Sequence, residues 1–309
     1  MSVMRTVLLK GSESAWLRER ATQTAFVRRA VSRFMPGESF DDMLGAARVM
    51  AGQGVGSVFT RLGEGVRDRA EADAVLAHYL ECLTRLRQIG VDCEPSIKPT
   101  QLGLDIDRRL ALDHLLALAE RAHECGTYLW VDMEQSCYVD VTLDFMHRLR
   151  ERYPQVGVCL QAYLQRTRED LVDLMGRGVG IRLLKGAYNE PATIAFPKKS
   201  DVDANYLALA QTMVEAGSRA AGSRVVFGTH DVPLIAAIRQ HARLSQVEAS
   251  AYEFHMLYGI QRAEQLRLVS DSALVRVLIA YGAYWFPWYM RRLAERPANV
   301  WFVAKSLFG

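Results

Sequence analysis

The stretch VGVCLQAYLQRTREDLVDLMGRGVGIRLLKG, residues 156 to 186, decides the fold. It starts with an apolar run from Val156 to Tyr163, continues through an amphipathic segment from Thr167 to Gly178, and ends in a second apolar run from Gly180 to Gly186. Short apolar runs are typical of strands that are buried on both faces, and a helix between two of them favours parallel pairing. We therefore interpret these residues as one strand–helix–strand unit.

The same unit recurs along the chain. The predicted strands are Gly56 to Leu62, Val91 to Ile97, Tyr128 to Met133, Val156 to Tyr163, Gly180 to Gly186, Arg224 to Thr229, Tyr252 to Leu257 and Leu274 to Ala280. A helical stretch follows each of the first seven, and Trp285 to Arg296 follows the eighth. Eight such units without a linker or charge block between them predict an α/β protein with a closed (β/α)8 TIM-type barrel rather than two domains.

The segment before the first predicted strand looks helical from residue 12 to residue 50, with a break at Pro36–Gly37. We expect residues 1–50 to form an N-terminal helical segment packed on a barrel of residues 51–309, the whole being a single domain. Periodicity leaves open whether these helices cover the bottom of the barrel, pack on another subunit or touch lipid.

Composition excludes some classes of protein. A formal charge of +3 on 309 residues, with no dense basic run, argues against a nucleic-acid binder. No apolar run is long enough for a signal peptide or a membrane span. The odd number of cysteines, without C-x-x-C spacing, favours reduced thiols and a cytoplasmic location. These are Cys82, Cys93, Cys125, Cys137 and Cys159.

Polar side chains stand at or just past the ends of most predicted strands. They are Lys98, Asp132, Glu134, Gln161, Arg182, Lys185, Thr229, His230, Glu253 and His255. The carboxyl ends of barrel strands meet at one mouth, where the active sites of this fold lie. We therefore expect these side chains to line one pocket.

Two motifs suggest chemistry only weakly. Residues 53–56 (QGVG) resemble part of a dinucleotide fingerprint but precede a strand instead of following one, which favours a flexible lead into that strand. Asp132, Glu134, His230 and His255 offer metal ligands without any close pair spacing. A metal-dependent lyase or hydrolase on the same barrel, and a non-catalytic scaffold that binds an anion, stay open as alternatives.

The cations are more informative. Lys98, Arg182 and Lys185, together with Arg291 and Arg292 in the helix after the last strand, are assigned to the mouth or its lid. Burial of so much positive charge is costly unless an anion compensates it, and paired arginines suit a carboxylate. Glu295 lies four residues after Arg291 and is placed to hold it, although a solvated helix face with a salt bridge explains this spacing equally well.

Six segments resemble the proline dehydrogenase family, in the family's order and over about residues 50 to 305. They are EPSIKPTQLG (94–103), VDME (131–134), IRLLKGAYNEP (181–191), FGTHD (227–231), EFHMLYG (253–259) and YMRRLAER (289–296). The length resembles the monofunctional bacterial form, which lacks an aldehyde dehydrogenase part.

The resemblance implies a distorted (β/α)8 barrel that binds FAD and oxidises L-proline to 1-pyrroline-5-carboxylate, with a quinone as electron acceptor and hence peripheral contact with the inner face of the cell membrane. Homo-oligomers are also compatible with it. Asp132 and Arg182 would be the catalytic pair, and Arg182 would also touch the flavin. The residues implied to bind substrate are Lys98, Tyr188, Leu278, Glu295, Arg291 and Arg292. The residues implied to bind FAD are Met133, Gln161, Lys185, Gly186, Ala187, Thr229 and His230.

Two segments depart from the family's pattern. Leu278 replaces a tyrosine that commonly packs on the substrate ring, and Ala283 to Trp288 lacks the usual charged residue. Leu278 keeps an apolar wall without a hydroxyl, which leaves open whether hydroxyproline is excluded.

Overall fold

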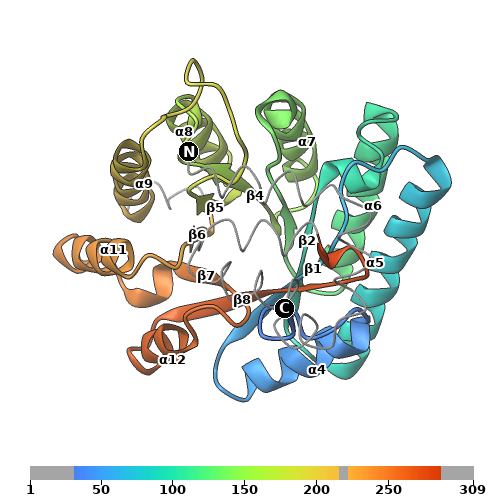
Figure 1. Ribbon diagram of the computed structural model, residues 1–309, viewed down its shortest axis with the longest axis horizontal. Coiled ribbons are helices and arrows are strands. Elements are labelled where there is room, and N and C mark those ends of the chain that lie inside the picture. Colours follow the sequence, from blue (N-terminus) through green and yellow to red (C-terminus); the bar gives the residue numbers. More distant parts are fainter. Residues whose placement is uncertain (1–30, 216–221, 287–309) are drawn as a thin grey trace, which may run out of the picture.

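A computed structural model describes residues 31–215 and 222–286. All eight predicted strands form, and they pair in parallel in chain order, with β8 closing onto β1 (Figure 1). The strands are β1 (Gly56–Arg61), β2 (Cys93–Ile97), β3 (Leu129–Val131), β4 (Val156–Gln161), β5 (Gly180–Leu184), β6 (Val225–Gly228), β7 (Glu253–Leu257) and β8 (Leu274–Tyr281). The predicted barrel is confirmed.

An α-helix follows each of the first seven strands, and the helices surround the barrel in Figure 1. The helices are α4 (Phe40–Ala51), α5 (Arg69–Ile89), α6 (Arg108–Glu124), α7 (Val139–Arg150), α8 (Thr167–Gly176), α9 (Lys199–Val214), α11 (Val232–Leu244) and α12 (Arg262–Ser270). Short 3-10 turns lie at Pro99–Leu102, Ser136–Tyr138 and Ala249–Ala251. The predicted helix Trp285 to Arg296 lies outside the described residues from position 287 onward.

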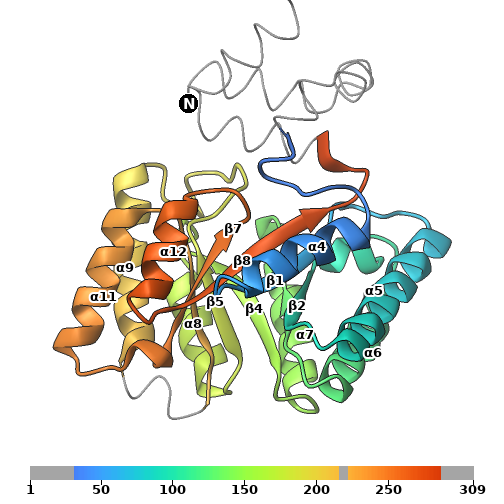
Figure 2. The same cartoon turned by 90° about the horizontal axis from the view of Figure 1, so that it is seen from below.

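Helix α4 packs against the side of the barrel. A capping box starts it, because the Ser39 hydroxyl accepts from the Asp42 amide and the Asp42 carboxylate accepts from the Ser39 amide. Its apolar face packs on β1 and β8, beside which it lies in Figure 2. The Phe40 ring meets the Phe59 ring edge-on, with centroids 6.1 Å apart. This helix therefore covers the side of the barrel, which none of the three arrangements left open by periodicity had included. Residues 1–30 lie outside the described residues.

Two glycines make room for aromatic rings inside the barrel. Gly157 in β4 and Gly180 in β5 are paired neighbours. A Cβ atom on Gly157 would lie 2.6 Å from the Trp130 ring, and one on Gly180 would lie 1.9 Å from the Tyr128 hydroxyl. The absence of side chains at these positions thus lets Tyr128 and Trp130 fill the interior.

A partly buried ionic cluster closes the amino-terminal end of the barrel. Arg224 binds Glu253 through two hydrogen bonds of 2.6 and 2.8 Å and binds Glu94 at 2.8 Å. Arg276 adds contacts of 3.3 Å to Glu94 and 3.4 Å to Glu253. Two positive and two negative side chains therefore balance one another, which makes their burial tolerable.

This cluster corrects part of the sequence prediction. Glu253 and His255 were expected at the mouth, but Glu253 is the first residue of β7 and binds the arginines at the opposite end. His255 is the middle residue of the strand, and its buried ring packs edge-on against Trp130. The prediction was wrong for both residues because inward-facing residues alternate along a whole strand, so polarity alone does not show which end a residue occupies.

No α-helix within residues 31–215 and 222–286 combines the length and the apolar character needed to cross a bilayer. The five cysteines are free thiols, as predicted.

Candidate active site

Asp132 is the centre of a polar cluster at the carboxyl end of β3. Its Oδ1 atom accepts a hydrogen bond of 2.6 Å from Arg182 Nη2 and one of 2.7 Å from the Ser96 hydroxyl. Its Oδ2 atom lies 3.3 Å from Lys98 Nζ. The structure thus brings together three of the predicted residues: Lys98 directly after β2, Asp132 directly after β3 and Arg182 within β5.

The electrostatics of this cluster keep Asp132 ionised. Burial by itself raises the pKa of Asp132, but the charges of Lys98 and Arg182 and the hydrogen bond from Ser96 outweigh burial and lower its pKa to about 2. A carboxylate with two cationic partners is a poor general base at neutral pH. Asp132 is therefore suited to orienting Lys98 and Arg182 and balancing their charge.

Arg182 lies deeper than the sequence suggested. It is the third of five residues in β5 and only 3% exposed, and its guanidinium carbon is 5.1 Å from the centroid of the Trp130 ring. Its Nε atom donates to the Cys159 sulfur at 3.0 Å. The sequence analysis did not include Ser96, Trp130 and Cys159 in the site. Each lies two residues before a predicted site residue, so the period-2 alternation of a strand could have indicated them.

Glu134 and Gln161 form a second buried group beside the first. Glu134 accepts hydrogen bonds from the Thr100 amide and hydroxyl, and burial raises its pKa above the ordinary value. Gln161 donates through Nε2 to the carbonyl oxygens of Met133 and Glu134. Its Oε1 atom is buried and has no hydrogen-bond partner among the described residues. That oxygen is an acceptor left for a ligand with an N–H or O–H group.

The predicted residues after β5 and β6 are held by local contacts. Lys185 Nζ lies 2.5 Å from Asp203 and 2.7 Å from Asp231, which also caps α11. Thr229 accepts from the Asp231 amide through its hydroxyl. The His230 Nε2 atom accepts from the Leu257 amide at 2.7 Å, so that its other ring nitrogen carries the proton.

The loop after β5 is fastened across the carboxyl end of the barrel. Gly186 has a φ of 120°, and a Cβ atom there would lie 2.2 Å from the Tyr163 ring, so only glycine fits. Glu190 accepts hydrogen bonds from the Ser136 amide and hydroxyl at 2.7 and 2.6 Å, which ties this loop to the one after β3. Ala187 is exposed and Tyr188 half-buried on the tied segment.

The remaining predicted residues are Met133, Leu278, Arg291, Arg292 and Glu295. Met133 is buried beside Asp132, and Leu278 is half-buried against the interior group of Val58, Trp130 and Val226. Arg291, Arg292 and Glu295 lie outside the described residues.

The metal hypothesis finds no support in the described part of the chain. No three His, Cys, Asp or Glu side chains converge there in a way that would hold an ion. Asp132 and Glu134 are hydrogen-bonded to other partners, and His255 lies in the barrel interior.

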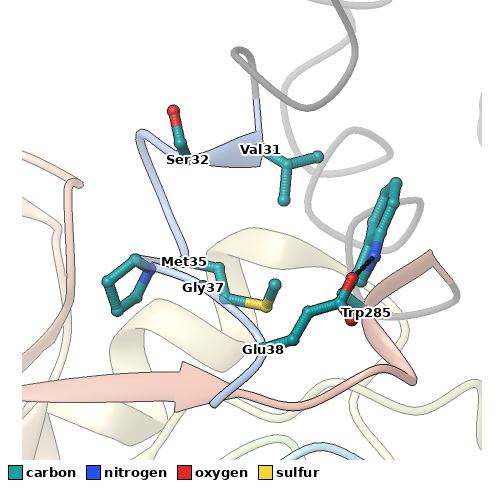
Figure 3. A pocket seen from close by; sticks show the side chains of 7 residues that line it. Val31, Ser32, Met35, Gly37, Glu38 and Trp285 are labelled. Atoms are coloured by element: carbon teal, nitrogen blue, oxygen red, sulfur yellow. Dashed lines mark hydrogen bonds between the residues drawn. The ribbon is translucent and has the colours of Figure 1, made fainter. Parts of the chain in front are cut away.

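A small pocket lies away from this cluster, next to Trp285. Figure 3 shows the Trp285 indole donating to Glu38 at 3.1 Å, with Val31 and Met35 nearby. None of the predicted site residues that the structure describes lines it.

Comparison with known proteins gives the family. The proline dehydrogenase family profile matches residues 43–305. The chain belongs to the proline dehydrogenase family. It is 32% identical over 297 residues to proline dehydrogenase 1 of Bacillus subtilis, covering 94% of this chain and 97% of that protein. It is 32% identical over 280 residues to proline dehydrogenase of Deinococcus radiodurans, covering 89% of each.

Solved structures show the same fold. Proline utilization A from Bdellovibrio bacteriovorus, inactivated by N-propargylglycine, aligns with a TM-score of 0.81 at 23% identity and covers 94% of this chain. The alignment spans 36% of that longer protein. The distorted (β/α)8 barrel implied by the family resemblance is thereby confirmed.

Proposed function

We propose that this chain is an oxidoreductase that converts L-proline to 1-pyrroline-5-carboxylate. The observation that carries the proposal is the charged cluster of Lys98, Asp132 and Arg182 at the carboxyl end of the barrel, in a chain of the proline dehydrogenase family. In this reaction the C5–H bond breaks with its electron pair, a C5–N double bond forms, and the nitrogen loses a proton.

The carboxylate of proline would bind to Lys98 together with Arg291 and Arg292. The Lys98 ammonium has three donors, and Asp132 is its one carboxylate partner within residues 31–215 and 222–286, so it retains capacity for a second anion. Arginine pairs bind carboxylates in bidentate fashion, and Glu295 would orient them. Tyr188 and Leu278 would form the walls around the ring, with Leu278 offering only apolar contact.

FAD fits the residues present. The buried Oε1 atom of Gln161 has no protein partner among the described residues and is an acceptor suited to an imide N–H such as the flavin carries. We propose that Met133, Gln161, Arg182, Lys185, Gly186, Ala187, Thr229 and His230 hold this cofactor. When bound, FAD supplies the two-electron acceptor for the chemistry. The protein's part is to fix C5 of proline and to keep Arg182 and Lys98 charged beside it.

A quinone would take up the electrons afterwards, which implies transient contact with a membrane surface by a cytoplasmic protein. This part of the proposal follows from the family resemblance and needs its own test with a short-chain quinone as acceptor.

The absorbance spectrum of the isolated protein tests the proposal. A flavin spectrum that is bleached by L-proline without oxygen is the expected result, and a protein that binds no FAD would contradict it. Replacement of Arg291 or Arg292 by Met should raise KM about tenfold or more, because a charged hydrogen bond contributes about 1.5–3 kcal/mol. Arg148→Met, in an exposed surface pair, is the control and should leave KM unchanged.

A further inference from the structure

The guanidinium group of Arg182 is fixed along one edge. Its Nε atom donates to Cys159, and its Nη2 atom donates to the Ser96 hydroxyl and to Asp132, both at 2.6 Å. Nε–H and one Nη2–H point in the same direction, because the group is planar. Within the described part of the chain Nη1 makes no hydrogen bond, so this nitrogen is left for a ligand.

The Cys159 thiol links both members of the Arg182–Asp132 pair. Arginine has no acceptor atom, so the sulfur must accept the 3.0 Å hydrogen bond from Nε. Its own hydrogen is then directed to Asp132 Oδ1, 3.5 Å away. The thiol is fully buried, and burial raises its pKa to about 12, so it carries its proton at neutral pH. One side chain thus acts as acceptor for the cation and donor for the anion.

The indole of Trp130 supports the same guanidinium from its face. Trp130 is itself held by a hydrogen bond of 2.8 Å from its Nε1 to Glu94. The ring offers the guanidinium no hydrogen-bond acceptor, so it does not select which nitrogen faces which neighbour. Cys159 adds an acceptor at Nε, so that Nε and Nη2 are both bonded along one edge.

We propose that Cys159 is a positioning residue for Arg182. By holding Nε, it fixes the direction in which Nη1 faces the cofactor and substrate. The inference deepens the proposed function and rests on it, since the role of Arg182 in the reaction belongs to that proposal.

The chain offers a matched control in Cys93. This residue is also a buried cysteine on a barrel strand, but its sulfur faces outward and lies 3.9 Å from the Met43 sulfur. Cys159→Val and Cys93→Val remove a buried thiol with nearly the same change of volume. Only Cys159→Val deprives an arginine of its acceptor.

The first measurement is anaerobic reduction of bound flavin by proline. Cys159→Val should lower the rate constant about tenfold with KM nearly unchanged, on the scale of a lost hydrogen bond to a charged group. Cys159→Ser retains a donor and an acceptor and should stay within about threefold of the natural protein. Cys93→Val should match the natural protein. If Cys159→Val and Cys93→Val have equal rates, Cys159 only fills space and the proposal fails.

The second measurement needs neither substrate nor turnover. Exchange of the Arg182 Nε–H with water is followed by NMR on arginine-labelled protein, with the signal assigned by its loss in Arg182→Lys. Cys159→Val should accelerate this exchange, whereas Cys159→Ser and Cys93→Val should not. Unchanged exchange in Cys159→Val would overturn the proposal.

Two further outcomes are decisive. If Cys159→Val does not fold, Cys159→Ala replaces it, and equal rates for Cys159→Ala and Cys159→Ser would refute the role of the acceptor. If the natural protein is not reduced by proline, the proposed function fails, while the exchange measurement still decides whether Cys159 holds Arg182.

Discussion

Replacement of Asp132 by Asn is the sharpest test of the electrostatics at the barrel mouth. The substitution keeps the shape of the side chain and removes the charge that faces Arg182 at 2.6 Å and Lys98 at 3.3 Å. The Asp132 side chain is only 16% exposed, so solvent screens these contacts weakly. Two cations would then stand close together without their shared partner.

The size of the effect follows from the pKa of Asp132. Its fall from 3.8 to about 2 corresponds to about 2.5 kcal/mol of preference for the ionised form in the folded protein, at about 1.4 kcal/mol per pKa unit. Removal of one partner from a buried pair typically costs about 3–5 kcal/mol. We therefore expect Asp132→Asn to lower the free energy of unfolding at pH 7 by about 2–4 kcal/mol.

The pH dependence has a defined sign. Because the folded pKa is lowered, the stabilisation is complete above the unfolded pKa near 3.8 and is lost as pH falls toward about 2. The difference between the natural protein and Asp132→Asn should be constant from pH 7 to about pH 5 and should narrow below pH 4.

Urea unfolding at several pH values measures this difference. Asp144→Asn is the control, because Asp144 forms an exposed helical pair with Arg148 at 3.0 Å, and such pairs contribute about 0.5 kcal/mol or less. The reasoning is refuted if Asp132→Asn is no less stable than Asp144→Asn at pH 7, or if the difference does not narrow in acid.

Three further predictions concern the barrel interior. Gly180→Ala should lower the free energy of unfolding by about 1–3 kcal/mol, since its Cβ would lie 1.9 Å from a tyrosine hydroxyl, whereas Gly176→Ala, with open space around it, should not. Arg224→Met should destabilise by about 3–5 kcal/mol in thermal or urea unfolding, because it leaves the buried Glu94 and the partly buried Glu253 short of a cation. The exposed Arg109→Met is the neutral reference. His255 has its pKa lowered by burial to about 3, so the natural protein should lose stability as pH falls below about 6.5. His255→Gln should weaken this loss in an acid-unfolding titration, and an unchanged titration would show that His255 does not stay neutral when folded.

Several parts of the fold could be predicted from sequence because they depend on local order. Each strand is a short apolar run bounded by polar or turn residues, and the segment from Val156 to Gly186 shows this pattern without ambiguity. Parallel pairing then follows, because a helix must connect successive strands. The convergence of Lys98, Asp132 and Arg182 could also be predicted, because the carboxyl ends of the strands in a barrel meet at one mouth.

The position of a side chain along the barrel axis could not be predicted from the sequence. Glu253 is a charged residue at the start of β7 and Lys98 is one directly after β2, yet the sequence marks both only as polar residues of a strand segment. Glu253 belongs to the amino-terminal cluster, whereas Lys98 lies at the mouth. Likewise, Cys159 and Trp130 read as ordinary apolar strand residues, and their contacts with Arg182 exist only because three strands stand at a particular stagger.

The sequence by itself thus determined the eight strands, the helices after the first seven of them and the family, because hydrophobic periodicity and motif order are properties of the linear chain. Only the tertiary structure decided which charges neutralise one another and at which end of the barrel they lie. The physical reason is that Coulomb interactions depend on distance through space, and the stagger of the closed sheet sets those distances between residues as far apart in sequence as Glu94 and Arg224.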